Sequence, residues 1–316
     1  MQQARIAVLG SMNVDLVTRL DRFPRPGETV GARAFAMYPG GKGANQAVAC
    51  GRLGADVAMY GALGGDALAA RLRESLRWAN VSVAAVVDVA DVATGTAAIW
   101  VDGAGENMIA IAAGANARVD AAYVDAHLPA LAGAAYLLLQ LEVPIDTLAH
   151  LLESLPRQGG PRVILDPAPA APLDTLDLTR VWLLTPNEHE LASLTGLPTS
   201  SDAEIAAAAR RLAADSGVHT VLTKAASRGA FVSEGERFDR IPGFPVPAVD
   251  TTAAGDAFNG ALAAALAGAV GEPMRLADAV RFAHAAAAVS VGRAGAQPAM
   301  PDRGEVVSFL REHVTA

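Results

Sequence analysis

The chain has 316 residues, of which 52% are hydrophobic and 18% are charged, and its formal net charge at pH 7 is −8. This composition supplies a large buried core and excludes a disordered chain. The acidic balance argues against nucleic-acid binding, which depends on Lys and Arg neutralising phosphates. The longest apolar runs, such as residues 260–270, are too short to span a membrane.

The N-terminal segment and the cysteine content indicate the cellular compartment of the protein. Residues 5–10 are too short for the apolar region of a signal peptide and are typical of a first strand. The single cysteine, Cys50, excludes an internal disulfide and fits a reducing compartment. It lies in an apolar helical pattern, which predicts a small core residue. We therefore expect a soluble, cytoplasmic protein.

Short apolar runs alternate with longer alanine-rich stretches along most of the chain. The predicted buried strands are Ile6–Leu9, Ala58–Tyr60, Tyr136–Leu139, Val163–Leu165, Trp182–Leu184 and Val221–Thr223. The predicted helices are Gly43–Leu53, Ala67–Trp78, Ile145–Leu155, Glu188–Thr195 and Ala203–Asp215. Continuous hydrophobicity in the strands favours a parallel sheet covered on both faces. The alternation predicts an α/β fold with a doubly wound, mainly parallel sheet and helices on both faces.

Two β-rich segments interrupt this pattern. Residues 14–38 contain a Pro- and Gly-rich turn between strand-like pieces. Residues 94–113 alternate along Thr96–Val101, turn, and return through Asn107–Ala112, which predicts a β-hairpin. We expect these segments to form a small β-sheet lid over a core made of residues 1–13, 39–93 and 114–316. Ligands bind at the carboxyl ends of parallel strands, where such a lid would close.

One carboxylate, Asp256, stands where a small-residue loop leads into an apolar helix. A helix N-terminus attracts anions, because its first N–H groups lack partners within the helix. An N-cap is the commonest role for an Asp at a helix start. The preceding Ala253, Ala254 and Gly255 favour another role, because a cap requires no bare loop. We expect Asp256 to act as a base beside a bound phosphate.

A second glycine-rich loop, residues 39–46, also opens a helix. Its glycines let a ligand approach the backbone, and the side chain of Asn45 can bond two adjacent hydroxyls. The spacing matches neither the Walker P-loop nor the dinucleotide-binding glycine pattern. A tight turn alone would explain one or two of these glycines, but not the whole run.

Polar residues also follow several predicted strands. Asn13 and Asp15 suit sugar hydroxyls, although both types are ordinary turn residues. Glu142 ends another strand, and Asn187 follows a further one. Glu190 can hold Mg²⁺ through water, and the alternative is an acidic helix N-terminus.

For three further residues a structural role is the simpler interpretation. We prefer the acidic helix N-terminus for Glu188 and a surface position for His189. His284 lies in an apolar helix and is more typical of a hydrogen-bonded core histidine than of a catalyst. Packing against a nucleotide base is the alternative for His284.

Two of these segments resemble the signature motifs of the PfkB carbohydrate kinases. They are Gly40-Gly41-Lys42-Gly43-x-Asn45 and Asp250-Thr251-x-Ala253-x-Gly255-Asp256-x-Phe258. Further similar segments occur in the same order, at residues 10–15, 41–49, 113–116, 185–188, 281–288 and 295–298. The chain resembles most closely the family members that phosphorylate D-ribose. The resemblance implies ATP-dependent phosphorylation of the ribose 5-hydroxyl, with Mg²⁺ as cofactor, K⁺ as activator and a homodimer formed through the lids.

The resemblance also implies roles for individual residues. The base would be Asp256, beside an anion hole formed by Ala253, Ala254 and Gly255. The sugar would be bound by Asn13, Asp15, Gly41, Lys42, Gly43, Asn45, Glu142 and Asp256. The nucleotide would be bound by Asn187, Glu190, Lys224, Ser227, Arg228, Gly229, Gly255 and His284. The monovalent cation would be held by Asp250, Thr252, Ser290, Arg293, Gly295 and Ala299, several of them through backbone carbonyls.

The chain departs from the family pattern at three positions. Lys224 stands where Thr is common, Ala226 where Gly is common, and Ala299 where a small polar residue is common. A lysine at position 224 can still reach a phosphate, whereas Ala226 must tolerate the backbone geometry. Two alternatives stay open: a family kinase acting on 2-deoxyribose or adenosine, and a non-catalytic sugar-binding regulator. The intact Asp256 argues against the regulator.

Overall fold

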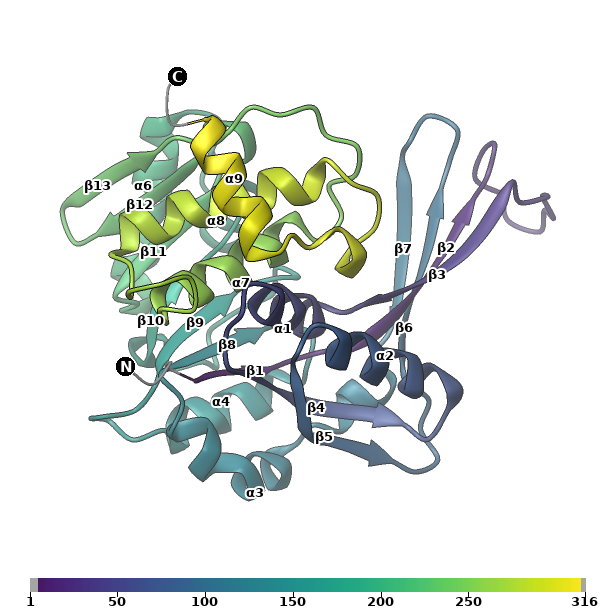
Figure 1. Ribbon diagram of the computed structural model, residues 1–316, viewed down its shortest axis with the longest axis horizontal. Coiled ribbons are helices and arrows are strands. Elements are labelled where there is room, and N and C mark those ends of the chain that lie inside the picture. The colour runs from purple at the N-terminus through teal and green to yellow at the C-terminus, as the bar shows by residue number, and fades with distance from the viewer. Residues whose placement is uncertain (1–4, 314–316) are drawn as a thin grey trace.

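The computed structural model describes residues 5–313 and contains a large sheet and a separate small sheet (Figure 1). The large sheet has nine strands in the order β13-β12-β11-β10-β9-β8-β1-β4-β5. They are β1 (Ile6–Leu9), β4 (Val57–Gly64), β5 (Ser82–Val89), β8 (Tyr136–Gln140), β9 (Arg162–Asp166), β10 (Val181–Leu184), β11 (Thr220–Lys224), β12 (Ala230–Glu234) and β13 (Arg237–Ile241). Only the β11–β12 and β12–β13 pairs of this sheet are antiparallel, so the predicted mainly parallel sheet is confirmed.

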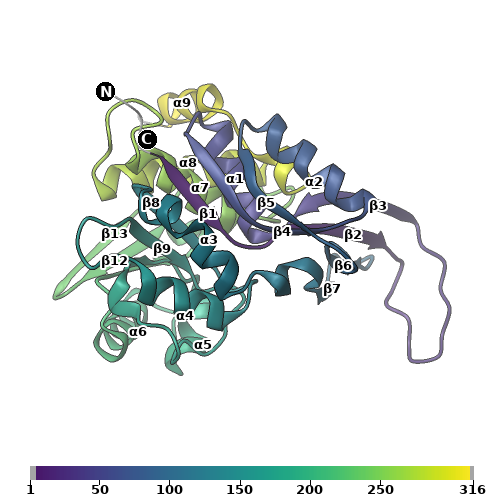
Figure 2. The ribbon, with the colours of Figure 1, turned by 90° about the horizontal axis from the view of Figure 1, so that it is seen from below.

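Helices cover both faces of the large sheet, as predicted (Figure 2). One face carries α1 (Lys42–Arg52), α2 (Ala67–Trp78), α7 (Ala254–Leu266), α8 (Leu276–Val291) and α9 (Arg303–Glu312). The other carries α3 (Ala121–Ala132), α4 (Ile145–Ser154), α5 (Glu188–Thr195) and α6 (Asp202–Ser216). Alternate residues of β1 enter the two hydrophobic cores, Ile6 and Val8 on one side and Ala7 and Leu9 on the other. Between residues 5 and 313, no helix is long and apolar enough to cross a bilayer.

The predicted helices match the observed ones to within one or two residues at each end. Five helices and strands were not predicted: α3, which contains Pro129, α9, β5, β12 and β13. In β12 and β13 the chain doubles back at the edge of the sheet, so these two strands lack the helix that separates parallel strands.

The small sheet projects from one side of the core (Figure 1). Its strands are β2 (Asn13–Arg19), β3 (Ala34–Gly40), β6 (Gly95–Val101) and β7 (Asn107–Ala112), in the order β3-β2-β6-β7. The predicted hairpin corresponds to β6 and β7, which pair antiparallel. The division into a core and a lid stays a prediction, and residues 1–4 and 314–316 of the predicted core lie outside the described residues.

The backbones of α1 and α7 touch at Gly260. A Cβ atom placed on Gly260 would lie 2.5 Å from the Cβ of Ala49 and 2.6 Å from the carbonyl oxygen of Gln46, both on α1. The thiol of Cys50, which is fully buried, donates to the Gly260 carbonyl at 3.2 Å. The predicted core position of Cys50 is therefore confirmed. This close crossing brings the N-terminal ends of α1 and α7 together.

Gly260→Ala is expected to destabilise the fold by roughly 1–3 kcal/mol, because the added methyl group forces the two helices apart. The matched control is Gly65→Ala, since a Cβ atom on Gly65 meets no atom within 4 Å. The control should change the free energy of unfolding by less than about 0.5 kcal/mol. Urea denaturation measures both. Equal stability of the two variants would show that the contact between α1 and α7 does not constrain the fold.

Candidate active site

Asp256 lies in the first turn of α7 but does not cap it. The N-cap residue is Ala253, which has left-handed backbone angles (φ 59°, ψ 17°) and makes no side-chain cap. The Asp256 side chain points to α1 instead, where Oδ2 accepts from Asn45 Nδ2 at 2.9 Å and Oδ1 accepts from Gln46 Nε2 at 3.2 Å. The N-cap interpretation of Asp256 is thus excluded. A left-handed alanine is strained by roughly 1–2 kcal/mol, and such strain concentrates at functional sites.

Further amides fix how Asn45 and Gln46 point. Gln297 Nε2 donates to Asn45 Oδ1 at 3.1 Å, and Gln140 Nε2 donates to Gln46 Oε1 at 2.7 Å. With their oxygens bound in this way, both amides turn their N–H groups toward Asp256. The carboxylate is therefore held at both oxygens before any ligand enters.

Burial and the charge of Lys42 shift the pKa of Asp256 in opposite directions. Burial raises the pKa of Asp256 to about 6, Lys42 acts to lower it, and Asp166 adds to the rise. Burial alone would lower the pKa of Lys42, but the carboxylates of Asp256, Asp166 and Glu142 raise it above its ordinary value. Lys42 is consequently charged at neutral pH, and Asp256 is mostly ionised but close to its pKa.

A second carboxyl group with a raised pKa lies on the small sheet. Burial raises the pKa of Asp15 to about 7, and the charges of Glu142 and Asp256 add to this shift. A Cβ atom on Gly40 would lie 2.4 Å from Asp15 Oδ2, so the carboxylate packs directly against the neighbouring strand β3. Asp15, Glu142 and Asp256 form an acidic cluster. Strand β2 contributes Asp15, whereas Glu142 and Asp256 belong to the large α/β part.

The remaining predicted sugar residues lie beside this cluster. Asn13 Oδ1 accepts from Asn116 Nδ2 at 2.8 Å, which leaves the amide N–H groups of Asn13 for another partner. Glu142 Oε2 accepts from Ser11 Oγ at 2.5 Å and from the backbone N–H of Lys42 at 3.1 Å. Each of these side chains is oriented by a second residue rather than left free.

Chain packing accounts for two of the glycines in the loop before α1. Gly41 has a φ of 87°, and a Cβ atom on it would lie 2.6 Å from the backbone nitrogen of Asn13. A Cβ atom on Gly43 would lie 2.7 Å from the carbonyl carbon of Gly10. The loop thus packs backbone to backbone against the segment between β1 and β2. That the glycines also let a ligand approach stays a prediction.

A cavity of about 950 Å³ runs from Asp256 along α7 and α8. Its polar end is lined by Lys42, Asp166, Lys224, Gly255 and Asp256, and its apolar end by Phe244, Val246, Pro247, Ala287 and Val291. Six of the predicted nucleotide residues line it: Asn187, Glu190, Lys224, Ser227, Gly255 and His284. A charged end and an apolar end suit a ligand that carries phosphates at one end and a flat ring at the other.

His284 differs from a hydrogen-bonded core histidine. It is buried, its ring packs edge-on against Phe258 at 5.0 Å, and its Nε2 has no hydrogen-bond partner. Burial lowers the pKa of His284 to about 4, so the ring is neutral at pH 7. His284 also lines the cavity, which is compatible with the alternative interpretation, contact with a nucleotide base, although its Nε2 atom is buried.

Asn187 and Glu190 form the capping box of α5. Glu190 N–H donates to Asn187 Oδ1 at 2.8 Å, and Asn187 N–H donates to Glu190 Oε2 at 2.7 Å. Burial raises the pKa of Glu190. Both residues also line the cavity, so the cap and a ligand contact are compatible. His189 is exposed, as predicted.

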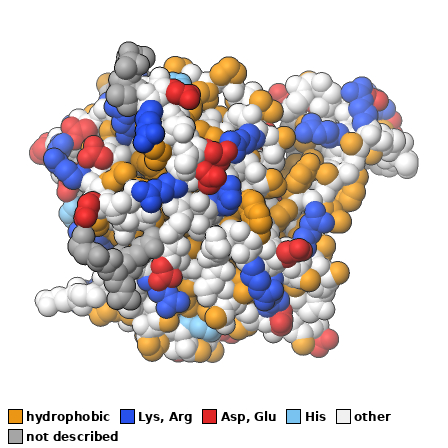
Figure 3. Space-filling model, in the orientation of Figure 1, with side chains coloured by type: hydrophobic (Ala, Val, Ile, Leu, Met, Phe, Trp, Pro, Cys, Tyr) orange, Lys and Arg blue, Asp and Glu red, His pale blue; other side chains and the backbone are white. Residues whose placement is uncertain are grey.

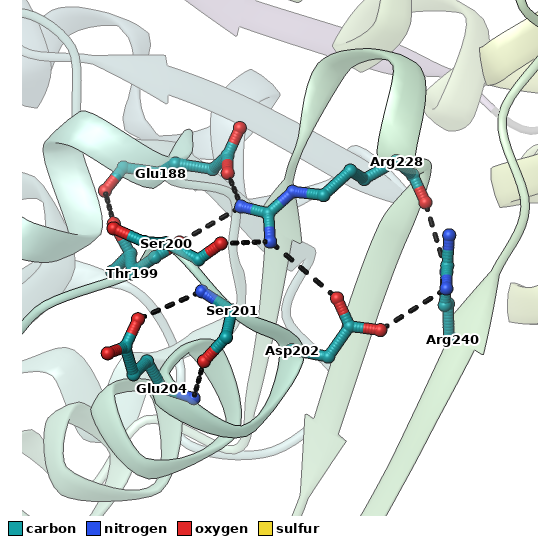
Figure 4. A network of polar contacts seen from close by, with 8 residues as sticks. All are labelled: Glu188, Thr199, Ser200, Ser201, Asp202, Glu204, Arg228 and Arg240. Carbon is teal, nitrogen blue, oxygen red and sulfur yellow. Dashed lines mark hydrogen bonds and ion pairs between the residues drawn. The ribbon is translucent and has the colours of Figure 1, made fainter.

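Arg228 does not line the cavity but is bound within a network of polar contacts (Figure 4). Its guanidinium donates to the carbonyls of Thr199 at 2.9 Å and Ser200 at 3.0 Å. It also pairs with the carboxylates of Glu188 and Asp202. These contacts tie the loop after β11 to the starts of α5 and α6, and they give Arg228 a structural role in addition to its predicted nucleotide contact.

The backbone of the same loop is strained at Ala226. Its φ is 46°, a left-handed value that suits glycine, which is common at this position in the family. Ala226 and Ser227 line the cavity, whereas Gly229 does not. Gly229 has a φ of 97°, and a Cβ atom on it would lie 2.2 Å from the Ile241 carbonyl oxygen, so packing requires this glycine.

The predicted cation residues tie the loop before α7 to the end of α8. Asp250 accepts from the backbone N–H of Thr252 and from that of Gly295, each at 2.9 Å. Burial alone would raise the pKa of Asp250, but these hydrogen bonds hold it below its ordinary value. Ser290 Oγ is buried without a hydrogen-bond partner. A buried hydroxyl oxygen that lacks a hydrogen-bond partner is compatible with an oxygen-coordinated monovalent cation.

Two other predicted cation residues make protein contacts. The guanidinium of Arg293 pairs with Glu305, and the buried Ala299 donates its backbone N–H to the Ala296 carbonyl. Across residues 5–313 there is no cluster of three or more His, Cys, Asp or Glu side chains suited to a metal. Mg²⁺ that binds mainly to phosphates needs only one or two carboxylates, and Glu190 is one of the carboxylates that line the cavity.

Five buried polar residues of the site were missed by the sequence analysis: Gln46, Asn116, Gln140, Asp166 and Gln297. Asp166 directly follows a predicted strand, so the rule that singled out Glu142 applies to it as well. Gln140 likewise follows the predicted strand Tyr136–Leu139, so the same rule applies to it. The other three amides carry no comparable signal, because their partners lie far away in the sequence.

Residues 3–303 match the model of the pfkB family carbohydrate kinases. The chain belongs to this family. It is 38% identical over 308 residues to the ribokinase of Haemophilus influenzae, covering 98% of both proteins. It is also 38% identical over 261 residues to the deoxyribokinase of Salmonella typhi, covering 82% of this chain and 84% of the relative. The structure of Arabidopsis thaliana ribokinase complexed with ribose and ATP superposes with a TM-score of 0.90 at 34% identity, covering 98% of this chain and 99% of that one.

Proposed function

We propose that the chain is a cytoplasmic ribokinase, which transfers a phosphoryl group from ATP to the 5-hydroxyl of D-ribose and releases ADP. The observation that carries the proposal is the position of Asp256. Its buried carboxylate lies between the polar cluster of Asp15, Asn45 and Glu142 and a cavity with one charged end. A relative named ribokinase and a homologous structure with ribose and ATP support the same substrates.

In this mechanism the chain positions the reactants and stabilises charge, since phosphoryl transfer needs little covalent help. Asp256 accepts the proton of the 5-hydroxyl while Asn45 and Gln46 hold its carboxylate. The N-terminus of α7 faces the charge that develops on the phosphoryl group. In the present conformation the Ala254 N–H donates to the Thr251 carbonyl at 3.2 Å, which defines the loop just before this helix.

We further propose that two metal ions, Mg²⁺ and K⁺, bind at the site. Mg²⁺ would neutralise phosphate charge, with Glu190 as its protein carboxylate. K⁺ would be held by Asp250, Thr252 and Ser290, together with the Arg293, Gly295 and Ala299 region. Asp250 already fixes the loop that leads to Ala253, so a cation there would order the same loop. The lid would exclude water that competes with the sugar for the phosphoryl group.

The substrate test is release of ADP with ribose, 2-deoxyribose, fructose and adenosine, each with and without K⁺. Ribose should give the highest kcat/KM, and K⁺ should raise it. A site that bonds a hydroxyl rejects an analogue lacking it by up to roughly 10⁴-fold. Preference for 2-deoxyribose would make the chain a deoxyribokinase, and sugar binding without any turnover would favour a non-catalytic regulator.

Asp256→Asn should lower kcat by roughly 10²–10⁴-fold, because the base is lost, while ribose binding is retained. The matched control is Asp278→Asn. Asp278 occupies the third position of α8, as Asp256 does in α7, but it is exposed. Turnover is measured by ADP release and sugar binding by calorimetry. Near-normal turnover of Asp256→Asn would contradict the assigned base.

The pH dependence follows from the two raised pKa values. Asp256 must be ionised to accept a proton, and the pKa values of Asp256 and Asp15 are about 6 and about 7. The value of kcat/KM should therefore fall as the pH drops through 7 and 6 and should be level above that range. Asp15→Asn should remove the upper step and leave the lower one. A single acidic limb near the ordinary aspartate pKa would contradict the raised value for Asp256.

We also infer a homodimer that forms through the small sheet. The exposed fractions of Trp100, Met108, Ile109 and Ile111 are 40%, 50%, 56% and 52%, and all four lie on β6 and β7. Figure 3 shows hydrophobic side chains gathered along this projecting part. Strand β7 is exposed along its whole length and forms one edge of the sheet. An apolar sheet with an open edge is typical of an interface between subunits.

Ile109→Lys combined with Ile111→Lys should convert the dimer to a monomer, because the two charges cannot be buried between subunits. Leu197→Lys is the control, since Leu197 is exposed but lies outside the small sheet. Sedimentation velocity measures the mass of each form. A parent protein that is monomeric at high concentration would contradict the dimer.

A further inference from the structure

Two charged side chains form an ion pair at the polar end of the cavity. Asp166 ends β9 and Lys224 ends β11, with β10 between them in the sheet. Lys224 Nζ lies 2.9 Å from Asp166 Oδ1, and the exposed fractions of the two side chains are 13% and 4%. Both residues line the cavity. The pair is therefore nearly buried in the protein but open to a ligand.

The second carboxylate oxygen of Asp166, Oδ2, is connected to Asp256 through the side-chain amide of Gln46. Gln46 Nε2 donates to Asp166 Oδ2 at 3.1 Å and to Asp256 Oδ1 at 3.2 Å. One amide nitrogen thus joins two carboxylates, and Gln140 fixes the amide from its oxygen side. The result is a continuous path of polar contacts from Lys224 through Asp166 and Gln46 to Asp256.

The ammonium group of Lys224 lies at the start of α7. A Cβ atom on Gly255 would be 3.4 Å from Lys224 Nζ. Gly255 and Asp256 belong to the first turn of that helix, whose N–H groups attract anions. The ammonium and the helix terminus consequently face the same part of the cavity, and together they offer two sources of positive potential to a phosphate.

We propose that Lys224 contacts the phosphoryl group that is transferred, and that Asp166 is a positioning residue that holds the Lys224 ammonium against the first turn of α7. This inference rests on the proposed kinase function. An ammonium group has three donors, so Lys224 can bond Asp166 and a phosphate oxygen at once. Gln46 extends the same constraint to the base, so that the phosphoryl group and the sugar hydroxyl are positioned by one network.

The ion pair of Lys224 and Asp166 also explains how the fold tolerates a lysine at position 224, where threonine is common in the family. A lysine in place of the common threonine brings a positive charge into a nearly buried place, which is costly without a partner. Asp166 supplies that partner at hydrogen-bond distance. The chain thereby gains a cation at the reacting phosphate without leaving an unpaired buried charge in the ligand-free protein.

The test compares the binding of a non-hydrolysable ATP analogue with that of AMP, using calorimetry in the presence of Mg²⁺. Lys224→Met should weaken binding of the ATP analogue by roughly 10- to 100-fold, as expected for loss of a hydrogen bond to a charged group. Binding of AMP should stay unchanged, because AMP lacks the terminal phosphates. Lys224→Arg should restore most of the affinity. Equal binding of the analogue by Lys224→Met and the parent protein, or an equal loss for both ligands, would overturn the proposal.

The variant Asp166→Asn tests whether Asp166 positions Lys224 for the reaction or contributes to ATP binding. It should lower kcat by roughly 10-fold or more, because the Lys224 ammonium is no longer held against the first turn of α7. The KM for ATP should stay the same or fall, because a negative charge near the phosphates is removed. A merely structural role would raise KM and lower kcat together, and that result would overturn the positioning role.

A double variant, Lys224→Met with Asp166→Asn, removes both charges and leaves no unpaired ion in the interior. It should fold and should show the same loss of affinity for the ATP analogue as Lys224→Met. Parent-like affinity and kcat in this variant would show that the pair serves only the fold. If the parent protein phosphorylates no sugar, the proposed function fails, whereas the comparison of the ATP analogue with AMP still tests the phosphate contact of Lys224.

Discussion

The crossing of α1 and α7 at Gly260 is the constraint on which the site depends. Neither helix carries a complete site: α1 supplies Asn45 and Gln46, and α7 supplies Asp256. Because no side chain separates the two backbones at Gly260, the N-terminal ends of both helices meet, and the two amides reach the carboxylate. Two positive helix ends converge there, which offsets part of the repulsion within the acidic cluster.

The rest of the site extends from this point in two directions. Toward the small sheet lie Asp15 and Glu142, whose environment suits hydroxyl groups. Toward α8 lies the cavity, which changes from charged to apolar along its length. Almost every polar side chain between them is oriented by a second side chain, so the site is organised before ligands bind. Such preorganisation reduces the reorganisation needed during phosphoryl transfer.

The fold was largely predictable from the sequence, and the site only in part. Buried strands and amphipathic helices leave a local periodic signal, so α2 and α5 were predicted with their observed bounds. The glycine-rich loop and Asp256 were recognisable because each run of small residues at a helix start is longer than a turn or a cap requires. The Asp256–Asn45 bond joins residues 211 positions apart, and no local pattern encodes which amide meets which carboxylate. The strain at Ala226, in contrast, was foreseeable from the resemblance, because the family commonly has glycine at this position and few other residues adopt a left-handed φ.

The raised pKa values of Asp15 and Asp256 have a consequence for the ligand-free fold. An unfolded chain ionises both groups near the ordinary value of 3.8, whereas the folded protein holds its protons up to about 7 and about 6. Above pH 7 the native state therefore carries two ionised groups in surroundings that disfavour their charge, at a cost of several kcal/mol by proton linkage. This penalty begins to shrink as the pH falls below 7 and 6 and is gone only below the unfolded value of 3.8, so mild acid stabilises the ligand-free fold while it protonates the proposed base. The two buried carboxylates thus destabilise the native state at neutral and higher pH, and burial in the surrounding hydrophobic cores must offset this cost.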